Sequence, residues 1–526
     1  MKKLIHIALS GALLLGSAAC TDLDINPPSS AVPEVFFKDE SSYKAFVARV
    51  YAGLAVTGQS GPAGAADISS LDEGFSNYLR QYWQFQTLTT EEAVIGWGDE
   101  GLPDLHNHSW TSANQFVRAM YYRIFFQVSM ANEFLRETSD EKLDARGVSA
   151  ATKADIKAYR AETRFLRALS YWHGIDLFGN IPFYTEADGV GSAAPRQASR
   201  EEVFNFIESE LNAIENDMVA PGANEYGRAD RAAVWMLQAK LFLNAKVYTG
   251  RERLGEAVTA SKKVIDSGVY SLQDTYKDLF RTDNHNSNEI IFAIPFDGLS
   301  TQTWGGMTFL VHAPVGGSMD PAAWGINGGW YGLRTTAAMA DKFSDVTGNT
   351  DERALFYTDG QSKEINAISN FNDGYGLPKF SNVSSSGEPG ADLNHCDTDF
   401  PMFRLADAYL MYAEATLRGG SGGDQALALQ YVNALRQRAY NGPVGNISAS
   451  ELTLDFILAE RARELYWEGH RRTDLIRFGQ FTDAGTWPWK GGVKEGRTTE
   501  SWRNLLPIPA AELLANPNLK QNPGGY

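Results

Sequence analysis

Apolar residues recur at helical spacing along most of the chain, and this pattern predicts a mainly α-helical fold. Gly179 and Pro182 follow one long periodic stretch and are expected to end it. The predicted helices span residues 41–54, 113–137, 150–177, 200–216, 231–247, 252–267, 403–418, 424–438 and 452–468.

Four of these segments form two helix pairs with short turns. Residues 231–247 and 252–267 form one pair, and residues 403–418 and 424–438 form another. Small residues face large ones within each pair, as in tetratricopeptide repeats, whose units stack to share one core. No fixed period runs through the whole chain, so we expect degenerate, tetratricopeptide-like units.

Two stretches lack this periodicity. Residues 55–110 carry glycine, proline and isolated aromatic residues, and residues 280–400 are rich in Gly, Ser and Asn, with one short strand predicted at 289–295. We interpret residues 280–400 as a loop-rich insert with few short strands, held on the helical scaffold. Binding residues usually lie on loops that a rigid framework positions. Function is therefore expected in residues 55–110 and 295–335.

The chain begins with a targeting signal. Lys2 and Lys3 precede an apolar run over residues 4–15, small residues fill 16–19, and Cys20 follows. The run is too short to span a bilayer as a helix. The pattern predicts a lipoprotein signal peptide at 1–19, a lipidated Cys20, a membrane tether at 20–35 and one binding domain at 36–526. An ordinary signal peptide followed by a chance cysteine is the alternative.

Composition narrows the classes of ligand. The formal net charge of −17 argues against nucleic acid, which needs a basic surface. The chain has two cysteines, and lipidation of Cys20 would leave Cys396 without a partner, so the core must stabilise the fold. Aromatic residues make up 12% of the chain, which suits recognition of flat apolar ligand faces.

Five separated blocks of the sequence carry a family resemblance. They are residues 161–183, 227–250, 400–415, 460–481 and 505–526. Together the blocks resemble the SusD/RagB family of outer-membrane nutrient-binding lipoproteins. The resemblance implies a helical scaffold beside an irregular binding lobe, and a protein without catalytic activity or cofactor. It also implies a location on the outer face of the outer membrane, where the protein captures a glycan and delivers it to a TonB-dependent transporter.

Within the family the likeness is greatest to starch-binding members, and it implies specific binding residues. Trp97, Trp304 and Trp330 fall on the positions of an aromatic arc that stacks on sugar rings. Arg80 and Asp72 fall on polar contact positions of the starch-binding members. Glu100 stands where those members use asparagine. Ile95 occupies the place of a further tryptophan, so one aromatic is missing.

The residues themselves support part of this assignment. Trp97, Trp304 and Trp330 each stand beside glycines in regions without periodicity, where a tryptophan is more often exposed than in a helical stripe. The alternative is that each indole plugs the core beneath a loop. The sequence assigns Trp324 neither to the core nor to the binding site. The tryptophans assigned to the core are Trp83, Trp110, Trp172, Trp235 and Trp467.

Other polar groups receive structural interpretations. His106 and His108 could ligate a metal, but without a third ligand we favour hydrogen bonds within a loop. Residues 283–289 (DNHNSNE) are rich in oxygen ligands but lack an EF-hand pattern, so no metal site is predicted. Buried ion pairs are expected for Arg471, Arg472 and Asp474.

The main hypothesis is a surface lipoprotein that binds an α-glucan, either starch or a maltooligosaccharide. The first alternative keeps the role but changes the glycan, since Ile95 and Glu100 depart from the starch-binding pattern. The second is a glycoside hydrolase that uses two of Glu91, Glu92, Asp99 and Glu100. The third is a scaffold whose helical repeats bind only protein partners.

Overall fold

The computed structural model describes residues 36–526 apart from 60, 63–65, 70, 190 and 192. The predicted signal peptide, Cys20 and the tether lie outside the described residues. Within the described ranges, no helix has both the length and the apolar character needed to cross a bilayer.

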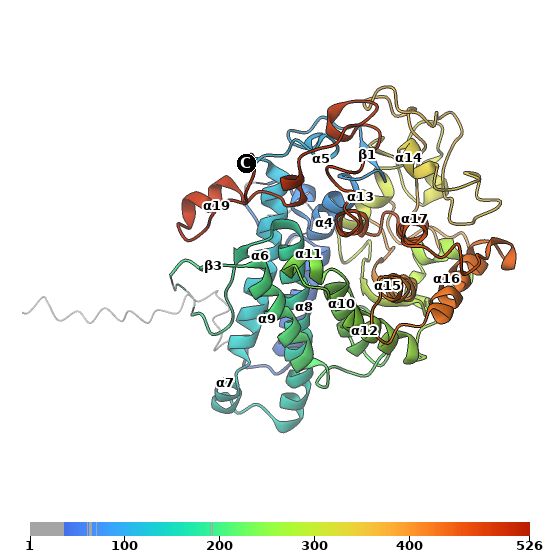
Figure 1. Ribbon diagram of the computed structural model, residues 1–526. Helices are drawn as coiled ribbons and strands as arrows, with labels where there is room; N and C mark the ends of the chain where they lie inside the picture. The colour runs from blue at the N-terminus through green and yellow to red at the C-terminus, as the bar shows by residue number, and fades with distance from the viewer. Residues whose placement is uncertain (1–35, 60, 63–65, 70, 190, 192) are drawn as a thin grey trace, which may run out of the picture.

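The first half of the chain is a layer of long helices (Figure 1). Helix α6 packs against α8, α8 packs against α9, and α3 lies against both α6 and α8. Asn114, Ser149 and Ser199 cap three of these helices by accepting backbone N–H groups with their side chains. The helices are α3 (Ser41–Ala55), α6 (Gln115–Glu137), α7 (Asp140–Ala145), α8 (Ala150–Phe178) and α9 (Arg200–Ile214).

The predicted helix pairs stack on one another. Helix α10 packs on α12, α12 on α15, and α15 on α16, so the pairs share a continuous core. The helix predicted over 231–247 is interrupted at Asn244, whose side chain donates to the Lys240 carbonyl. The helices are α10 (Arg231–Leu243), α11 (Ala245–Thr249), α12 (Leu254–Asp266), α15 (Leu405–Leu417), α16 (Gln425–Ala439), α17 (Leu454–Leu465) and α18 (Arg471–Arg477).

Helices also lie where loops were expected. The longest is α4 (Tyr78–Thr87), which crosses the interior with all of its residues buried. Its apolar residues do recur at helical spacing, but polar residues fill half of its ten positions, and these are buried too. The shorter helices are α5 (Asp104–Asn107), α13 (Gly306–His312), α14 (Ala337–Ala340) and α19 (Ala510–Ala515), with 3₁₀ turns at Gly74–Ser76, Tyr276–Phe280, Asn284–Asn286, Pro321–Trp324, Pro443–Gly445, Lys490–Gly492 and Ser501–Asn504.

Strands are few and occur as three antiparallel pairs. The strand predicted at 289–295 is confirmed as β4 (Ile290–Ile294), which pairs with β6 (Phe400–Arg404). The other pairs are β1 (Val94–Ile95) with β5 (Leu333–Arg334) and β2 (Ile181–Pro182) with β3 (Gln197–Ala198). Most of residues 280–400 is loop, although the boundaries of that insert remain a prediction.

The tryptophans assigned to the core follow the prediction with one exception. Trp83, Trp110, Trp172 and Trp467 are buried. Trp235 is only half-buried, because it lies on the outer side of α10, where its indole donates to Glu215.

Candidate functional site

A two-residue sheet brings Trp97 and Trp330 together. Strands β1 and β5 pair Ile95 with Leu333, and the ladder continues where the Gly96 N–H donates to the Gly332 carbonyl at 2.9 Å. The Trp97 indole then donates to the Trp330 carbonyl at 3.1 Å. The two ring centroids are 6.3 Å apart, with their planes inclined by 43°.

Trp304 reaches the same place from the loop before α13. Its backbone N–H donates to the Glu73 carboxylate at 2.9 Å, and its indole centroid lies 6.3 Å from that of Trp330 at an inclination of 52°. Trp304 is 41% exposed, and Trp97 and Trp330 are half-buried. The three indoles therefore form a bent row in the order Trp97, Trp330, Trp304, which we call the indole row.

A glycine makes room for the first indole. A Cβ atom on Gly332 would lie 2.6 Å from the ring of Trp97, closer than unbonded carbon atoms can approach. Gly98, on the other side of Trp97 in the sequence, has open space around its Cβ position. Only the first of these glycines is thus required for the position of the ring.

Two histidines lie against the indole row, and the sequence reasoning missed both. The His312 ring stacks on Trp330 at 4.8 Å and 25°, and the His395 ring lies 4.7 Å from Trp304. His312 donates from Nδ1 to the Gly328 carbonyl at 2.7 Å, and burial lowers its pKa, so the ring is neutral at pH 7. A polar residue inside the apolar run FLVHAPV was the available signal.

Arg80 extends from α4 to the edge of the row. Its guanidinium lies 4.1 Å from the Phe309 ring centroid and 5.9 Å from that of Trp97. Burial lowers its pKa to about 10, which leaves it charged at pH 7. Nε and Nη2 have no hydrogen-bond partner among the described residues. Both atoms are closed off from solvent, so they cannot themselves contact a ligand at the row.

The remaining predicted polar residues are exposed. Asp72 accepts from the Phe75 N–H at 3.2 Å and lies two residues before Gly74, which packs against Trp304. For Glu100, only the backbone carbonyl is engaged, by Gln115 at 2.7 Å, and no contact joins its side chain to the other five residues within the described ranges. Ile95 is fully buried in β1, so an aromatic ring is missing from a position that faces the interior.

The carboxylates considered for catalysis divide into two groups. Glu91 pairs with Arg471 and Lys342, and although burial opposes the charge, these cations hold its pKa at about 2. Burial raises the pKa of Glu92 to about 8, and its carboxyl group accepts from the Trp467 N–H at 3.0 Å. Both are part of the interior. Asp99 and Glu100 lie on one turn near the surface.

The other polar predictions are confirmed as structural contacts, apart from that for His106, whose buried Nδ1 has no hydrogen-bond partner among the described residues. His108 donates to the Thr89 carbonyl at 2.7 Å and accepts from Thr499 at 3.1 Å, while burial lowers its pKa to about 3. Arg471 pairs with Glu91, Arg472 with Asp176 and Asp474 with Arg461.

The oxygen-rich segment 283–289 is also engaged within the protein. Asp283 accepts from the backbone of Ser385 at 2.9 Å, and Glu289 pairs with Arg404 at 2.7 Å. Among the described residues, no group of three or more His, Cys, Asp or Glu side chains is placed to hold a metal ion.

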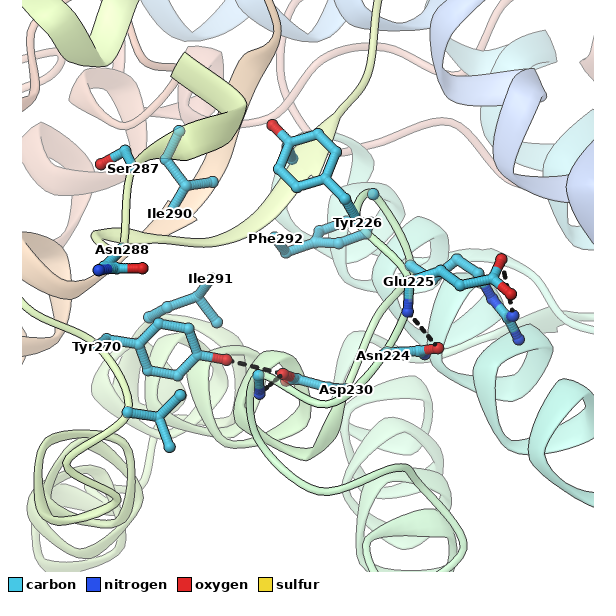
Figure 2. A pocket seen from close by; sticks show the side chains of 15 residues that line it. Asn224, Glu225, Tyr226, Asp230, Tyr270, Ser287, Asn288, Ile290, Ile291 and Phe292 are labelled. Atoms are coloured by element: carbon cyan, nitrogen blue, oxygen red, sulfur yellow. Dashed lines mark hydrogen bonds and ion pairs between the residues drawn. The ribbon is translucent and has the colours of Figure 1, made fainter. Parts of the chain in front are cut away.

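A cavity of about 240 Å³ lies between the start of α10 and β4, and Figure 2 shows the side chains that line it. The Tyr270 hydroxyl donates to Asp230 at 2.7 Å, and Asp230 also accepts from the Gly222 N–H and caps α10. Glu225 pairs with Arg228 at 3.4 Å. These polar groups already bind one another, so the cavity offers few free polar groups to a ligand.

Comparison with known proteins identifies the family. The model of the SusD family matches residues 349–526. The starch-binding protein SusD of Bacteroides thetaiotaomicron is 36% identical over 575 aligned positions, which cover 100% of this chain and 99% of that protein. The SusD-like protein P25 of Formosa agariphila is 25% identical over 99% of this chain and 98% of its own length.

Solved structures share the fold. The surface glycan-binding protein A of Bacteroides thetaiotaomicron in complex with laminarihexaose superposes with a TM-score of 0.70 at 20% identity, covering 92% of this chain and 99% of that one. The protein of the same name from Bacteroides fluxus gives a TM-score of 0.71 at 22% identity, covering 93% and 100%. The mainly helical architecture, with its stacked pairs and loop-rich lobe, is thus the SusD fold, and the chain belongs to the SusD family.

Proposed function

We propose that the protein is a cell-surface binding protein that holds an α-glucan, either starch or a maltooligosaccharide, on the indole row. The single observation that supports this most is the meeting of Trp97, Trp330 and Trp304 in one bent row. Sugar rings present C–H faces that stack on indoles, and Arg80 and Asp72 stand where hydroxyl groups at the sugar edge would need partners.

The bend of the row favours a coiled polymer over a flat one. Successive indole planes turn by 43° and 52°, so a ligand stacked on all three must itself curve. The relative with 36% identity is named for starch binding, whereas a structural neighbour holds laminarihexaose, a different glucan. The first alternative, the same role with another glycan, is therefore tested by comparing binding to starch with binding to other glycans.

Binding without hydrolysis fits the carboxylates best. Glycoside hydrolases place two carboxyl groups on opposite sides of the scissile bond, about 5–10 Å apart. Glu91 and Glu92 are buried and bonded inside the protein. Asp99 and Glu100 are sequence neighbours on one turn, which cannot enclose a sugar from both sides.

The family resemblance supports the site of action and the partner. We infer that Cys20 is lipidated, that the protein is anchored to the outer face of the outer membrane, and that it passes the glycan to a TonB-dependent transporter. Replacing Cys20 by alanine should release the protein from the membrane fraction without changing its glycan affinity. Glycan-dependent co-purification with an outer-membrane barrel would test the delivery step.

Affinity electrophoresis tests the ligand. The mature protein is run in native gels that contain starch, dextran, laminarin, levan or xylan. We expect retardation by starch, lost when Trp97 and Trp330 are both replaced by alanine. Trp235→Ala, which removes a half-buried indole elsewhere, is the matched control and should migrate like the wild type.

Other outcomes favour the alternatives. Retardation by laminarin alone would keep the role and reject the α-glucan. Release of shorter sugars from maltoheptaose would reject a binding protein, and unchanged migration in every glycan would favour a protein scaffold.

A further inference from the structure

A second pocket with the chemistry of a sugar site lies in the loop-rich lobe. It has a volume of about 440 Å³, within the range of roughly 300–1,000 Å³ typical of small-molecule sites. Its lining comes from separate segments and includes Thr275, Lys277, Trp324, Glu352 and Tyr357. We call it the Trp324 pocket. None of its lining residues belongs to the indole row.

Two aromatic rings form a corner in this pocket. The centroids of Trp324 and Tyr357 are 5.9 Å apart, and their planes are inclined by 74°. Both side chains are half-buried. The Trp324 indole N–H makes no hydrogen bond within the described ranges, whereas the Tyr357 hydroxyl contacts Ser318 at 3.1 Å. The corner thus offers an apolar face and a free donor to a ligand.

The charged groups at the pocket favour a neutral ligand with many hydroxyl groups. Lys277 is exposed and forms no ion pair with any described residue. Glu352 accepts from Asn441 at 2.6 Å through Oε1 only. Because one cation and one anion line the pocket, an anionic ligand would meet Glu352 and a cationic ligand would meet Lys277. Hydroxyl groups can accept from the ammonium and donate to the carboxylate.

The position of Trp324 is fixed by buried contacts. Asn382, which is fully buried, donates from its backbone to the Trp324 carbonyl at 3.0 Å and from its side chain to the Gly325 carbonyl at 2.8 Å. Gly325 has a φ of +67°, and a Cβ there would lie 2.0 Å from the Asn382 carbonyl oxygen. Only glycine therefore allows the turn that holds Trp324 in the pocket.

The same loop connects the pocket to the indole row. Trp324 and Trp330 are six residues apart, so their Cα atoms are separated by at most about 22 Å. We propose that the Trp324 pocket is a second saccharide site, which binds a neutral pyranose unit. One polymer chain can then engage both sites, and such bivalent binding raises polymer affinity without raising the affinity for a short oligosaccharide. The bivalent part of this inference rests on the proposed function, but the site itself does not.

Fluorine NMR tests the site directly. The protein contains 12 tryptophans, which are labelled as 5-fluorotryptophan, and Trp324→Phe and Trp330→Phe assign two of the resonances. We expect maltoheptaose to shift the Trp324 resonance both in the wild type and in a variant with Trp97, Trp304 and Trp330 replaced by alanine. Laminarihexaose and xylohexaose are titrated in parallel.

The outcomes separate the two proposals. A Trp324 resonance that no neutral oligosaccharide moves at millimolar concentration overturns the second site, whatever happens at the row. A Trp324 shift without any shift of Trp330 by maltoheptaose upholds the second site and rejects the α-glucan on the row.

Polymer binding provides the second readout. The double variant Lys277→Ala/Glu352→Gln, which leaves both rings in place, should weaken retardation by starch about tenfold and leave the affinity of the indole row for maltotriose, followed at the Trp330 resonance, unchanged. Equal loss for both ligands would place these residues in a single site with the row. No loss for either would overturn a role for the pocket in polymer capture.

Discussion

At the scale of single residues, the position of the Trp97 indole depends on the glycine at position 332. A methyl group on Gly332 would meet the Trp97 ring at 2.6 Å, so Gly332→Ala must displace that indole. We expect at least a fivefold to tenfold loss of glycan affinity, about 1–1.4 kcal/mol, measured by isothermal titration with maltoheptaose. Gly98→Ala is the matched control, because its Cβ position is open. Equal affinity of the two variants would contradict the role of Gly332.

Glu91 and Glu92 are adjacent in the sequence but differ in protonation. Burial raises the pKa of Glu92 to about 8, so the carboxyl group is protonated in the folded protein at pH 7. Its stabilising effect is complete below the unfolded pKa and is lost as pH rises through about 8. Between these two pH values, the contribution of this group to the free energy of unfolding falls by about 1.4 kcal/mol per pH unit. Glu92→Gln removes that dependence, so its stability relative to wild type should increase with pH.

The neighbouring substitution should act in the opposite direction. Arg471 and Lys342 outweigh the effect of burial and hold the pKa of Glu91 at about 2, so Glu91→Gln leaves two cations without their anion. We expect a loss of about 3–5 kcal/mol at neutral pH, decreasing as acid protonates the wild-type carboxylate in the unfolded state. Urea denaturation of both variants across pH 3 to 9 distinguishes them. If the free energies of unfolding of the two variants changed with pH in parallel, the different protonation states of Glu91 and Glu92 would be refuted.

At the scale of elements, sequence patterns reveal the longer helices, whether or not they face solvent. Helices α3, α6, α8 and α9 were predicted to within a few residues because apolar positions recur at helical spacing over at least 15 residues in each. Helix α4 was missed because it has only ten residues, half of them polar, within a stretch that carries glycine and proline. The β1–β5 pair was also missed, since two-residue strands far apart in sequence leave no period to detect, and yet this pair aligns Trp97 with Trp330.

The β1–β5 pair depends on Arg334 for its support. The buried guanidinium donates to the carbonyl groups of Gly332, Asn370 and Asp373 at 2.9–3.1 Å. Arg334→Ala removes the donor to these carbonyl groups, of which Gly332 keeps its bond from the Gly96 N–H. We expect a loss of about 2–4 kcal/mol of stability with earlier proteolytic cleavage in residues 362–373. Arg334→Lys should recover only part of the lost stability, since an ammonium group cannot replace the several fixed donor directions of a planar guanidinium. Full recovery would show that charge alone matters.

At the scale of the whole molecule, the resemblance to the SusD family predicted the residues of the indole row but not the histidines that pack against them. The three tryptophans, Arg80 and Asp72 came from matched segments, and the structure brings the indoles together from residues 97, 304 and 330. His312 and His395 were missed, although the apolar run around His312 was a signal, because sequence does not show which ring a histidine will contact. Their contacts with the indoles come only from the tertiary fold.

A buried ion network joins the loop-rich lobe to the helical scaffold. Arg404, in β6, pairs with Glu289 beside β4, with Glu464 of α17 and with Glu468. All four side chains are at most 1% exposed. Taking charges out of water is costly, and here the mutual attraction and hydrogen bonds offset that cost only while every partner is present.

Removing the central cation should therefore loosen the junction between lobe and scaffold. Arg404→Met keeps an apolar stem of similar length but leaves three buried carboxylates short of one partner, and we expect at least 3–5 kcal/mol of destabilisation. Arg251→Met removes an exposed arginine from its pair with Glu201 and should change stability by less than about 1 kcal/mol. Hydrogen exchange should show faster exchange in both β4 and α17 of the Arg404 variant, because one residue holds both. If protection falls in β4 alone, the lobe is held by other contacts and the network does not unite the two parts.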